Sequence, residues 1–599
     1  MKNTILKLKS IELDNFKNVK HGKIDLKEDK INNKISNILG IYGQNGSGKT
    51  SIINALYLLK LVVCGKELNE NIHNYICSNE KATSLGFEFR LYEGEEEYKI
   101  YYKFEIRRKQ RVICENDYDD AYYSDTYYNG AYIDENYCNG ITYYSNDVSG
   151  HATNNVSRDV SNNAFSHDPN NMNSDISSNM SSGSMNGEMN NGNSDAMNGE
   201  MNDRTSGATN GYMNNVISNA TSGYMNDSIS DENVMTGPIN FGKEMDTRVE
   251  ISKEKLSFSK LENNQWKNRV TIIDYDVDDE DYTFRPIKNY REVANTNSKK
   301  VNLGIAKGLS QEKSTSFIFS SKSLPMLLQS FSKNSKDYSD IIMSLRTFAL
   351  FNLFVIQNDD LGAININLLM PFSYMLKNER GGMRGNIPIK LFETSVIEID
   401  SFDIVKKVLE QINVVLKTIV PKLKIQLKNY GKETMANGKE GYKVELLSVR
   451  EKTIIPLKYE SDGIKKIISI MSVLIGMFNN ENIIVAIDEL DAGVFEYLLG
   501  EILEILSKSA QGQLIFTSHN LRALEKLNKD LVVFTTTNPE NRYISLSNVK
   551  GTNNLRDFYY RGIILGGQRE ELYDQTNKYE MSYAFKKAWM MSHEESHNI

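Results

Sequence analysis

The sequence predicts an α/β fold with a mixed sheet, an antiparallel β subdomain, a helical insertion and a disordered low-complexity loop. Three observations lead to this prediction. Residues 36–42 are a continuous apolar run before a glycine-rich loop and a stretch of helical spacing, as in a buried parallel strand that precedes a helix. Residues 84–107 alternate apolar and polar around a turn at Gly94, which predicts an antiparallel hairpin. From residue 443 to 548, strand and helix patterns alternate again.

Composition and charge limit the partners of the chain as a whole. The net charge of −8 gives no general basic surface, so contact with nucleic acid would require a local patch. The longest apolar run, residues 467–478, is far shorter than the ~20 residues that a membrane span requires. The first residues lack the apolar core of a signal peptide, and the four cysteines show no metal-ligand spacing. We therefore expect a cytoplasmic protein without membrane contact.

Changes in composition divide the chain into five predicted segments. Residues 1–113 and 443–550 are the two halves of one α/β core. Residues 247–442 are an accessory lobe of strands and helices. Residues 114–246 are a low-complexity insert, and residues 551–599 are a C-terminal tail.

Two stretches of the accessory lobe, residues 322–356 and 402–420, have the spacing of amphipathic helices. Neither is long or heptad-regular enough for an extended coiled coil.

The insert contains an imperfect tandem repeat. A Met-Asn pair recurs every twelve residues from Met189 to Met225, and MNGEMN occurs twice. The repeats lack the aliphatic positions that a stacked solenoid core requires. We therefore expect a disordered surface loop with no catalytic role.

Residues 43–50, GQNGSGKT, fit the phosphate-binding pattern G-x-x-x-x-G-K-[ST]. The glycines allow backbone N–H groups to surround a phosphate, and the positive end of the following helix adds to the attraction. Lys49 is expected to reach the β- and γ-phosphates and Thr50 to bind magnesium. The alternative, a chance glycine-rich turn, is disfavoured by the flanking strand and helix. The predicted nucleotide-binding residues here are Gly43, Gln44, Asn45, Gly46, Ser47, Gly48, Lys49, Thr50 and Ser51.

Two more buried strands end in polar residues. Residues 483–487 precede Asp488, which can hold magnesium, and Glu489, which can polarise an attacking water. An acidic helix start is the alternative interpretation of this pair. Residues 513–518 precede His519, which can hydrogen-bond a γ-phosphate or the attacking water, unless its role is structural.

A helix is predicted to begin within residues 460–466, ESDGIKK. Ser461 and Gly463 at this helix start predict an anion site. Capping of the helix by Ser461 is the alternative.

Taken in order, these motifs resemble those of the ABC-type ATPase heads of the SMC, RecF and OLD-like class. The resemblance covers residues 1–110 and 445–550, and it includes Asn15-Phe16-Lys17-Asn18, which is similar to an N-terminal element of RecF and SMC heads. It implies an ABC-type P-loop NTPase head with ATP and Mg²⁺ as cofactors.

The resemblance also implies roles for individual residues. Lys49, Glu489 and His519 would be catalytic, and Asp491 would be the D-loop acid of the ATP site. The signature motif, residues 461–465, would complete the ATP site of a second copy, so that ATP would hold a homodimer together.

The sequence departs from the family pattern at several points. ESDGIKK lacks the second glycine of the usual signature. The resemblance makes Asp488 and Glu489 the Walker B acids, and the Leu-His-Pro that often follows these acids is absent. Gln357 in FVIQNDD is the candidate glutamine-loop residue and magnesium ligand, with an ordinary surface amide as the alternative. The 80 residues after His519 contain no DxD, which disfavours an additional nuclease domain.

Further strings, such as DELDAGVFEYLLGEIL, resemble bacterial AAA-annotated ATPases, of which some relatives belong to phage defence. The expected function is therefore ATP binding and Mg²⁺-dependent hydrolysis in a DNA-related or defence process. The alternative is a nucleotide-dependent clamp with slow hydrolysis that regulates a separate effector. A GTPase is disfavoured, because the nearest match to NKxD, residues 528–531, places the acid one position early.

Nucleic acid is a further candidate partner, with a solvated helix face as the alternative interpretation of the same charges. The basic candidates are Lys406, Lys407, Lys417, Lys422, Lys424, Lys428, Arg380 and Arg384. Four more arginines are candidates for contacts with the γ-phosphate or a partner subunit, with salt bridges inside the core as the alternative. They are Arg522, Arg542, Arg556 and Arg561.

Overall fold

The computed structural model describes residues 4–28, 35–109, 144–145, 248–365, 368–378, 381–435, 437–546 and 554–594. The predicted disordered insert, residues 114–246, lies outside these residues except for 144–145. Among the described helices, none combines the length and apolar character that a membrane crossing needs.

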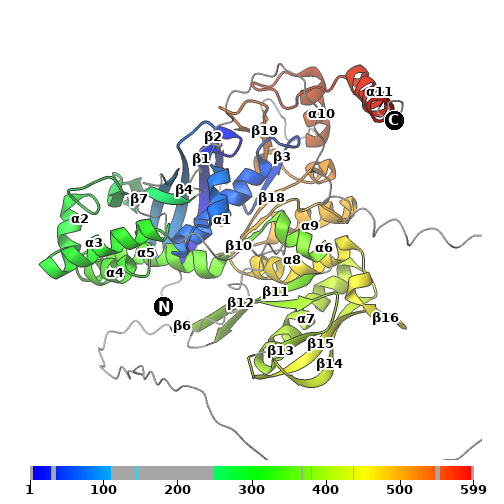
Figure 1. Cartoon of the computed structure of the whole chain (residues 1–599), viewed down its shortest axis with the longest axis horizontal. Coiled ribbons are helices and arrows are strands. Elements are labelled where there is room, and N and C mark those ends of the chain that lie inside the picture. The colour runs from blue at the N-terminus through cyan, green and yellow to red at the C-terminus, as the bar shows by residue number, and fades with distance from the viewer. Residues whose placement is uncertain are drawn as a thin grey trace, which may run out of the picture. The chain divides into compact units, whose positions relative to one another are not determined.

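A six-stranded mixed sheet combines strands from both predicted halves of the core (Figure 1). Its order is β10-β17-β18-β3-β19-β20, and every neighbouring pair is parallel except β19 and β20. Strand β3, from the start of the chain, lies between β18 and β19, from near its end. This arrangement confirms the prediction that two distant stretches build one mixed sheet. The strands are β3 (Ile38–Tyr42), β10 (Leu353–Ile356), β17 (Ile484–Ile487), β18 (Gln513–Thr517), β19 (Val532–Thr535) and β20 (Tyr543–Ile544).

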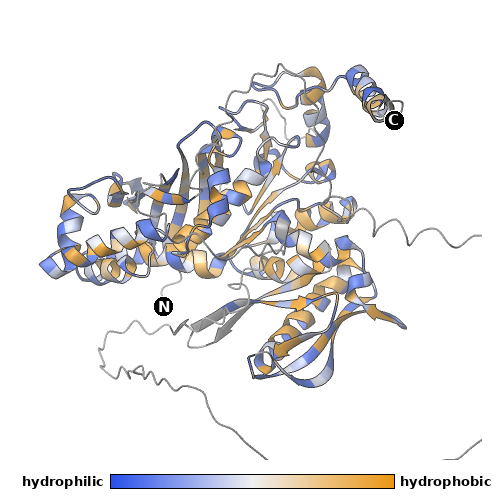
Figure 2. Cartoon of the chain, viewed as in Figure 1, coloured by the Kyte–Doolittle hydropathy of each residue, from blue (hydrophilic) through white to orange (hydrophobic). Residues whose placement is uncertain are grey.

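Successive side chains of these strands pack into two different hydrophobic cores. Leu39 of β3 belongs to the core that contains α1 (Lys49–Val63). Its neighbour Ile38 belongs to the core that contains α8 (Asp462–Asn479) and α9 (Glu496–Ser509). Because both faces of the sheet are covered, the strands are apolar along their length, as the colouring of Figure 2 shows.

An antiparallel sheet, the predicted β subdomain, has the order β2-β1-β4-β5-β7-β8, and β9 pairs with β7. Strands β4 and β5 form the predicted hairpin, with Gly94 in its turn at φ 65°. A left-handed φ is a conformation that glycine adopts without strain. The strands are β1 (Thr4–Phe16), β2 (Val19–Asp25), β4 (Ala82–Glu93), β5 (Glu96–Arg108), β7 (Val249–Glu262), β8 (Gln265–Trp266) and β9 (Val270–Asp276), and the 3₁₀ helix η1 (Glu70–Tyr75) precedes β4.

The region of the predicted accessory lobe also supplies strands to both sheets: β7, β8 and β9 to the antiparallel one and β10 to the central one. The predicted helix at 402–420 corresponds to α7 (Ile399–Ile419). The other elements are α2 (Ile287–Val293), α3 (Asn297–Glu312), α6 (Asn358–Asn365), β6 (Tyr144–Ser145), β11 (Leu369–Asn378), β12 (Gly381–Lys390), β13 (Ser395–Glu398), β14 (Leu423–Thr434), β15 (Glu440–Arg450) and β16 (Thr453–Pro456).

One stretch of predicted helix is a strand. Residues 322–356 are expected to be helical, and α4 (Ser323–Asn334) and α5 (Lys336–Thr347) fulfil this expectation only up to Thr347. After one π-helical turn, η3 (Phe348–Asn352), the chain becomes β10, which pairs in parallel with β17. The prediction is wrong there because the long-range pairing with β17 overrides the local apolar spacing.

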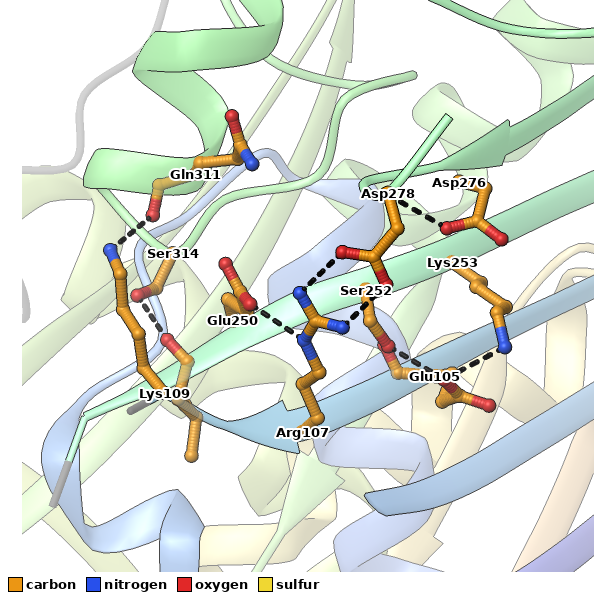
Figure 3. Close-up of polar contacts among 11 residues, drawn as sticks. Glu105, Arg107, Lys109, Glu250, Ser252, Lys253, Asp276, Asp278, Gln311 and Ser314 are labelled. Atoms are coloured by element: carbon orange, nitrogen blue, oxygen red, sulfur yellow. Dashed lines mark hydrogen bonds and ion pairs between the residues drawn. The ribbon is translucent and has the colours of Figure 1, made fainter. Parts of the chain in front are cut away.

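The two ends of the segment 110–247 are bonded to each other. β5 and β7 are antiparallel neighbours, and the Lys109 N–H donates to the Arg248 carbonyl at 2.9 Å. Figure 3 shows how Arg107 spans this junction: its guanidinium contacts Glu250 at 2.7 Å and Asp278 at 2.6 and 2.9 Å. Apart from β6, which pairs with β12, the segment therefore leaves and re-enters the fold at one closed strand pair.

We expect that a short Gly-Asn turn in place of residues 110–247, which also removes the two-residue strand β6, will leave the melting temperature unchanged or higher. Closing a shorter loop costs less entropy, by about 0.6 kcal/mol for each halving of loop length. Circular dichroism and calorimetry on the shortened and full chains would measure this. In the full chain, Arg107→Leu should lower the melting temperature, because it leaves Glu250 without its ion pair. A shortened chain that unfolds at a lower temperature than the full chain would contradict the prediction.

Candidate nucleotide site

The predicted motifs meet at one edge of the central sheet. Because β10, β17, β18 and β3 run parallel, the residues that follow them emerge at the same edge, where α/β proteins bind ligands. The loop 43–48 follows β3, Asp488 follows β17, His519 follows β18 by one residue, and Gln357 follows β10. Neighbouring strand ends are also linked by a backbone bond, from Asp488 N–H to the Ile356 carbonyl at 3.0 Å.

The loop 43–48 is shaped by the neighbouring strands. A Cβ on Gly43 would lie 1.7 Å from Thr535 Oγ1 of β19, so no other residue fits there. Ser47 Oγ donates to the Gln44 carbonyl at 2.6 Å, and the Tyr543 hydroxyl donates to the Gly48 carbonyl at 2.7 Å. The loop is therefore held in its curled form by contacts within the chain.

The remaining predicted residues of the loop differ in exposure. Asn45 and Gly46 are exposed at its tip, where the Asn18 side-chain amide donates to the Gly46 carbonyl. Ser51 is buried, and its hydroxyl lies 3.4 Å from Asn18 Oδ1. Asn18, from the turn after β1, thus supports the loop from outside.

Lys49 lies over the loop that precedes it. Its ammonium group donates to the Gly43 carbonyl at 3.0 Å and to the Gln44 carbonyl at 2.7 Å. The side chain is 6 % exposed, and this burial lowers its pKa to about 8, although Asp488, Glu489 and Asp491 act in the opposite direction. A phosphate bound in the loop would give the buried ammonium an adjacent negative charge.

Thr50 and Asp488 are in direct contact. The Thr50 hydroxyl donates to Asp488 Oδ1 at 3.2 Å, and the Thr517 hydroxyl donates to the same oxygen at 2.6 Å. Asp488 is 1 % exposed. One hydroxyl and one carboxylate side by side form the oxygen donor set that Mg²⁺ uses in phosphate sites, so these residues fit the ion.

Gln357 lies at the strand end next to that of Asp488, since β10 pairs with β17. Its side-chain amide donates to Asn54 Oδ1 of α1 at 2.8 Å, and its backbone N–H donates to Asp360 at 2.9 Å. The structure therefore ties Gln357 to the helix that follows the phosphate loop. Its role as a magnesium ligand stays a prediction.

Glu489 has a left-handed backbone, with φ 47°, which is uncommon for a glutamate and recurs at functional sites. The Thr517 hydroxyl accepts the Glu489 N–H at 2.7 Å. The Glu489 carbonyl accepts from the Lys466 ammonium and from the Ala492 N–H. Three contacts thus hold the backbone of the predicted general base.

Lys466 is a site residue to which the sequence motifs assign no role. It lies in the first turns of α8, is 3 % exposed, and has its pKa lowered to about 8 by burial. One feature of the sequence could have indicated that Lys466 is buried: it is a charged residue directly before an apolar helical run.

His519 and Asp491 lie close together. The backbone N–H of His519 donates to Asp491 Oδ2 at 3.1 Å. Burial lowers the pKa of His519, and the nearby Lys49 lowers it further, so the imidazole is neutral at physiological pH. The other oxygen of Asp491 is buried without a hydrogen-bond partner among the described residues.

The predicted signature residues lie beside the turn that contains Asp491. Ser461 is the exposed N-cap residue of α8, but its side chain makes no capping bond. A Cβ on Gly463 would lie 1.8 Å from the Gly493 carbonyl oxygen, so the start of α8 packs directly on that turn. Helix capping by the Ser461 side chain, the alternative to an anion site, is not observed.

Three of the four candidate arginines have partners inside the chain. Arg522 and Arg556 both pair with Glu525, at 2.6 and 2.8 Å. Buried Arg542 donates to the carbonyls of Thr536 and Asn18. The fourth candidate, Arg561, is exposed on α10 (Leu555–Leu565).

One residue of the predicted basic region, Arg384, has a guanidinium that is bonded inside the chain. Arg384 is half-buried, and its guanidinium donates to the carbonyls of Leu350 and Leu353. Lys422 pairs with Glu451 at 2.5 Å. Arg380 lies outside the described residues.

The mixed α/β sheet with its phosphate-binding loop and the antiparallel sheet together give a P-loop fold like that of an ABC-type head. The chain belongs to the AAA ATPase domain family, whose model matches residues 6–522. Among curated proteins, none matches the sequence.

The solved structures that resemble this chain share little sequence with it. An Smc head bound to the C-terminal winged-helix domain of ScpA is 10 % identical, with 90 % of this chain and 98 % of that chain covered and a TM-score of 0.32. An Smc head with an extended coiled coil, bound to the C-terminal domain of ScpA from Pyrococcus furiosus, is 10 % identical, with 91 % and 97 % covered and a TM-score of 0.30. The recombination mediator RecF with ATP is 22 % identical over 17 % of this chain and 24 % of that chain, with a TM-score of 0.13. These TM-scores denote a loose likeness.

Proposed function

We propose that the protein binds ATP with Mg²⁺ between the loop 43–50 and the pair Asp488–Glu489 and hydrolyses it. The observation that carries this proposal is the contact between Thr50 and Asp488 at 3.2 Å, with Lys49 buried in the loop beside them. A phosphate-binding loop, a magnesium donor set and an adjacent carboxylate are the parts that phosphoryl transfer to water requires.

Each residue has a distinct task in this proposal. Loop N–H groups and Lys49 hold the β- and γ-phosphates, and Thr50 and Asp488 hold the ion, which neutralises phosphate charge when bound. Glu489 accepts a proton from water as the water oxygen bonds to the γ-phosphorus and the bond to the β-phosphate oxygen breaks. His519 can hydrogen-bond the γ-phosphate or that water. The products are ADP and phosphate.

We further propose that ATP joins two copies. Ser461 is exposed at the start of α8 without capping its own helix, and the backbone N–H groups of this first turn form an anion site of the kind found at helix N-termini. A second copy that placed this helix start over the loop 43–50 would complete the ATP site. As the family resemblance implies, the dimer cycle would serve a DNA-related or phage-defence process, or regulate a separate effector.

The test measures the rate of ATP hydrolysis and the mass of the protein in solution. Phosphate release should require both ATP and Mg²⁺, and light scattering should show a doubling of mass with ATP and Mg²⁺ but not with ADP. Addition of DNA at increasing salt would reveal a nucleic-acid partner, because phosphate contacts weaken steeply with salt. A protein that neither binds nor hydrolyses ATP would overturn the proposal.

ATP binding should take up protons above neutral pH. The pKa of Lys49 is about 8 without nucleotide, and a bound phosphate favours the charged ammonium, so the complex has a higher pKa. The affinity for ATP should therefore fall by up to tenfold per pH unit above about pH 8. Calorimetry in buffers of different ionisation enthalpy would measure the uptake. With Lys49→Arg, whose guanidinium stays charged, the uptake at saturating ATP should disappear; if it persists, Lys49 is not the group that titrates.

Lys466→Met should lower kcat by about 10- to 100-fold with little change in KM, because Glu489 loses an anchor of its strained backbone. Steady-state kinetics separates the two constants. Asn479→Ala is a matched control, since it removes the hydrogen bond from the Asn479 side chain to the Ile475 carbonyl at the opposite end of the same helix. An unchanged kcat in Lys466→Met, or an equal loss in the control, would show that Lys466 does not position Glu489.

A further inference from the structure

The phosphate loop is bonded to the segment that leads from α10 to α11 (Lys578–Glu594). Gln44 Nε2 donates to Asp574 Oδ2 at 2.9 Å, and the Asp574 N–H donates to Gln44 Oε1 at 2.9 Å. The nitrogen and the oxygen of the Gln44 side chain are therefore both bonded to one residue, which lies 530 positions further along the chain. No predicted motif includes that residue.

Gln44 is also the residue around which the phosphate loop bends. Its carbonyl accepts from Ser47 Oγ at 2.6 Å and from the Lys49 ammonium at 2.7 Å. Next to it, Gly43 has no room for a Cβ against Thr535 at the end of β19. A fixed Gln44 therefore helps to fix the loop backbone, whose N–H groups would receive the phosphates.

The C-terminal segment is anchored close to Asp574. Leu572, two residues earlier, is 2 % exposed and belongs to the core that contains α8 and α9. The Glu571 carbonyl accepts the Thr537 N–H at 2.9 Å, in the turn between β19 and β20. Since β19 also confines the phosphate loop, both partners of the Gln44–Asp574 contact are already in place, and little entropy is lost when they bond. Two more bonds to the same turn run from Asn538 and Asn541 to the Glu570 carboxylate, at 3.0 and 2.8 Å.

A buried cation offsets the charge of the Asp574 carboxylate. Arg542 is 6 % exposed, and the carbonyls of Thr536 and Asn18 accept from its guanidinium. Burial lowers the pKa of Arg542, and the charges of Tyr543 and Asp574 act in the opposite direction. The carboxylate beside the phosphate loop is therefore accompanied by a positive charge, which reduces its repulsion of a phosphate.

We infer that Asp574 is a positioning residue of the ATP site, which holds Gln44 and thereby preorganises the phosphate loop. The inference rests on the proposed function and deepens it, because it adds a residue of the C-terminal segment to the same site. A loop that already has its bound form costs less to order when the phosphates arrive. The contact should therefore strengthen ATP binding and have little influence on the chemical step, in which Glu489 is the proposed base.

Two substitutions of Asp574 would test this role. Asp574→Ala should raise KM and the dissociation constant for ATP by about three- to tenfold, the effect of one hydrogen bond, with little change in kcat. Asp574→Asn should bind ATP almost as tightly as the unmodified protein, because its amide oxygen can still accept from Gln44 Nε2. Steady-state kinetics and an equilibrium titration with ATP would measure these values. An equal loss of affinity in both variants would assign the effect to the charge and contradict the inference.

Two further variants separate this role from a general effect of the segment. Glu571→Ala removes an exposed acid three residues earlier and keeps the carbonyl that accepts from Thr537, so the affinity for ATP should not change. Gln44→Ala should weaken ATP binding at least as much as Asp574→Ala. The double variant should bind ATP no more weakly than Gln44→Ala, because the two side chains act through one contact. Additive losses in the double variant would overturn the inference.

The titration also distinguishes this inference from the proposed function. If the unmodified protein binds ATP and Asp574→Ala binds it equally well, the inference is wrong and the proposed function stands. If the unmodified protein binds no ATP, the proposed function fails and this inference fails with it.

Discussion

Glu489→Gln should reduce kcat for ATP hydrolysis by about 100- to 10,000-fold while ATP binding is retained. The amide cannot accept the proton of the attacking water, whereas the backbone contacts of residue 489 with Thr517 and Lys466 do not depend on its side chain. ATP should therefore persist in the site, and the ATP-bound dimer should accumulate. Single-turnover kinetics with nucleotide extraction and light scattering would measure both effects.

The control is Glu481→Gln, an exposed glutamate in the turn before β17. This change removes the same charge from the same region and should leave kcat close to that of the unmodified protein. If Glu489→Gln hydrolyses ATP at the unmodified rate, another group activates the water and the role assigned to Glu489 is wrong.

Lys49→Ala should abolish measurable ATP binding and lower kcat/KM by about 1,000-fold. The Lys49 ammonium is the positively charged side chain of the loop. It is expected to stabilise the negative charge of the γ-phosphate as the reaction proceeds. Because the pKa of about 8 in the folded protein lies below the value of 10.5 for a free lysine, the buried charge destabilises the fold at neutral pH. The variant should therefore keep its melting temperature, and the loss of binding will not reflect unfolding.

Lys60→Met provides a matched comparison for Lys49→Ala. Lys60 lies on the same helix and also has its pKa lowered to about 8 by burial, but it is in the last turn of α1, away from the loop. Fluorescence titration with a labelled ATP analogue should show near-normal affinity for Lys60→Met and none for Lys49→Ala. Normal affinity in Lys49→Ala would remove the basis for placing the phosphates in this loop.

Sequence alone predicted the features that depend on local pattern. Three motifs come at the end of an apolar run: the loop 43–50, the pair Asp488–Glu489, and His519. A short apolar run that ends in such a motif indicates a buried parallel strand. Parallel strands bring their carboxyl ends to one edge, so the strand pattern was sufficient to predict that these motifs meet. The β4–β5 hairpin was predictable for the same reason, since alternation and Gly94 are local signals.

Only the tertiary structure decided the features that depend on long-range pairing. No periodicity showed that 353–356 would join the central sheet, that Lys466 would reach the backbone of Glu489, or that Asp574 would bind Gln44. The physical reason is that periodicity reports which side of an element is buried, whereas the partner on that side is chosen by the packing of the whole chain. The motifs of the candidate site were therefore readable from the sequence, and the contacts between them and the rest of the chain were not.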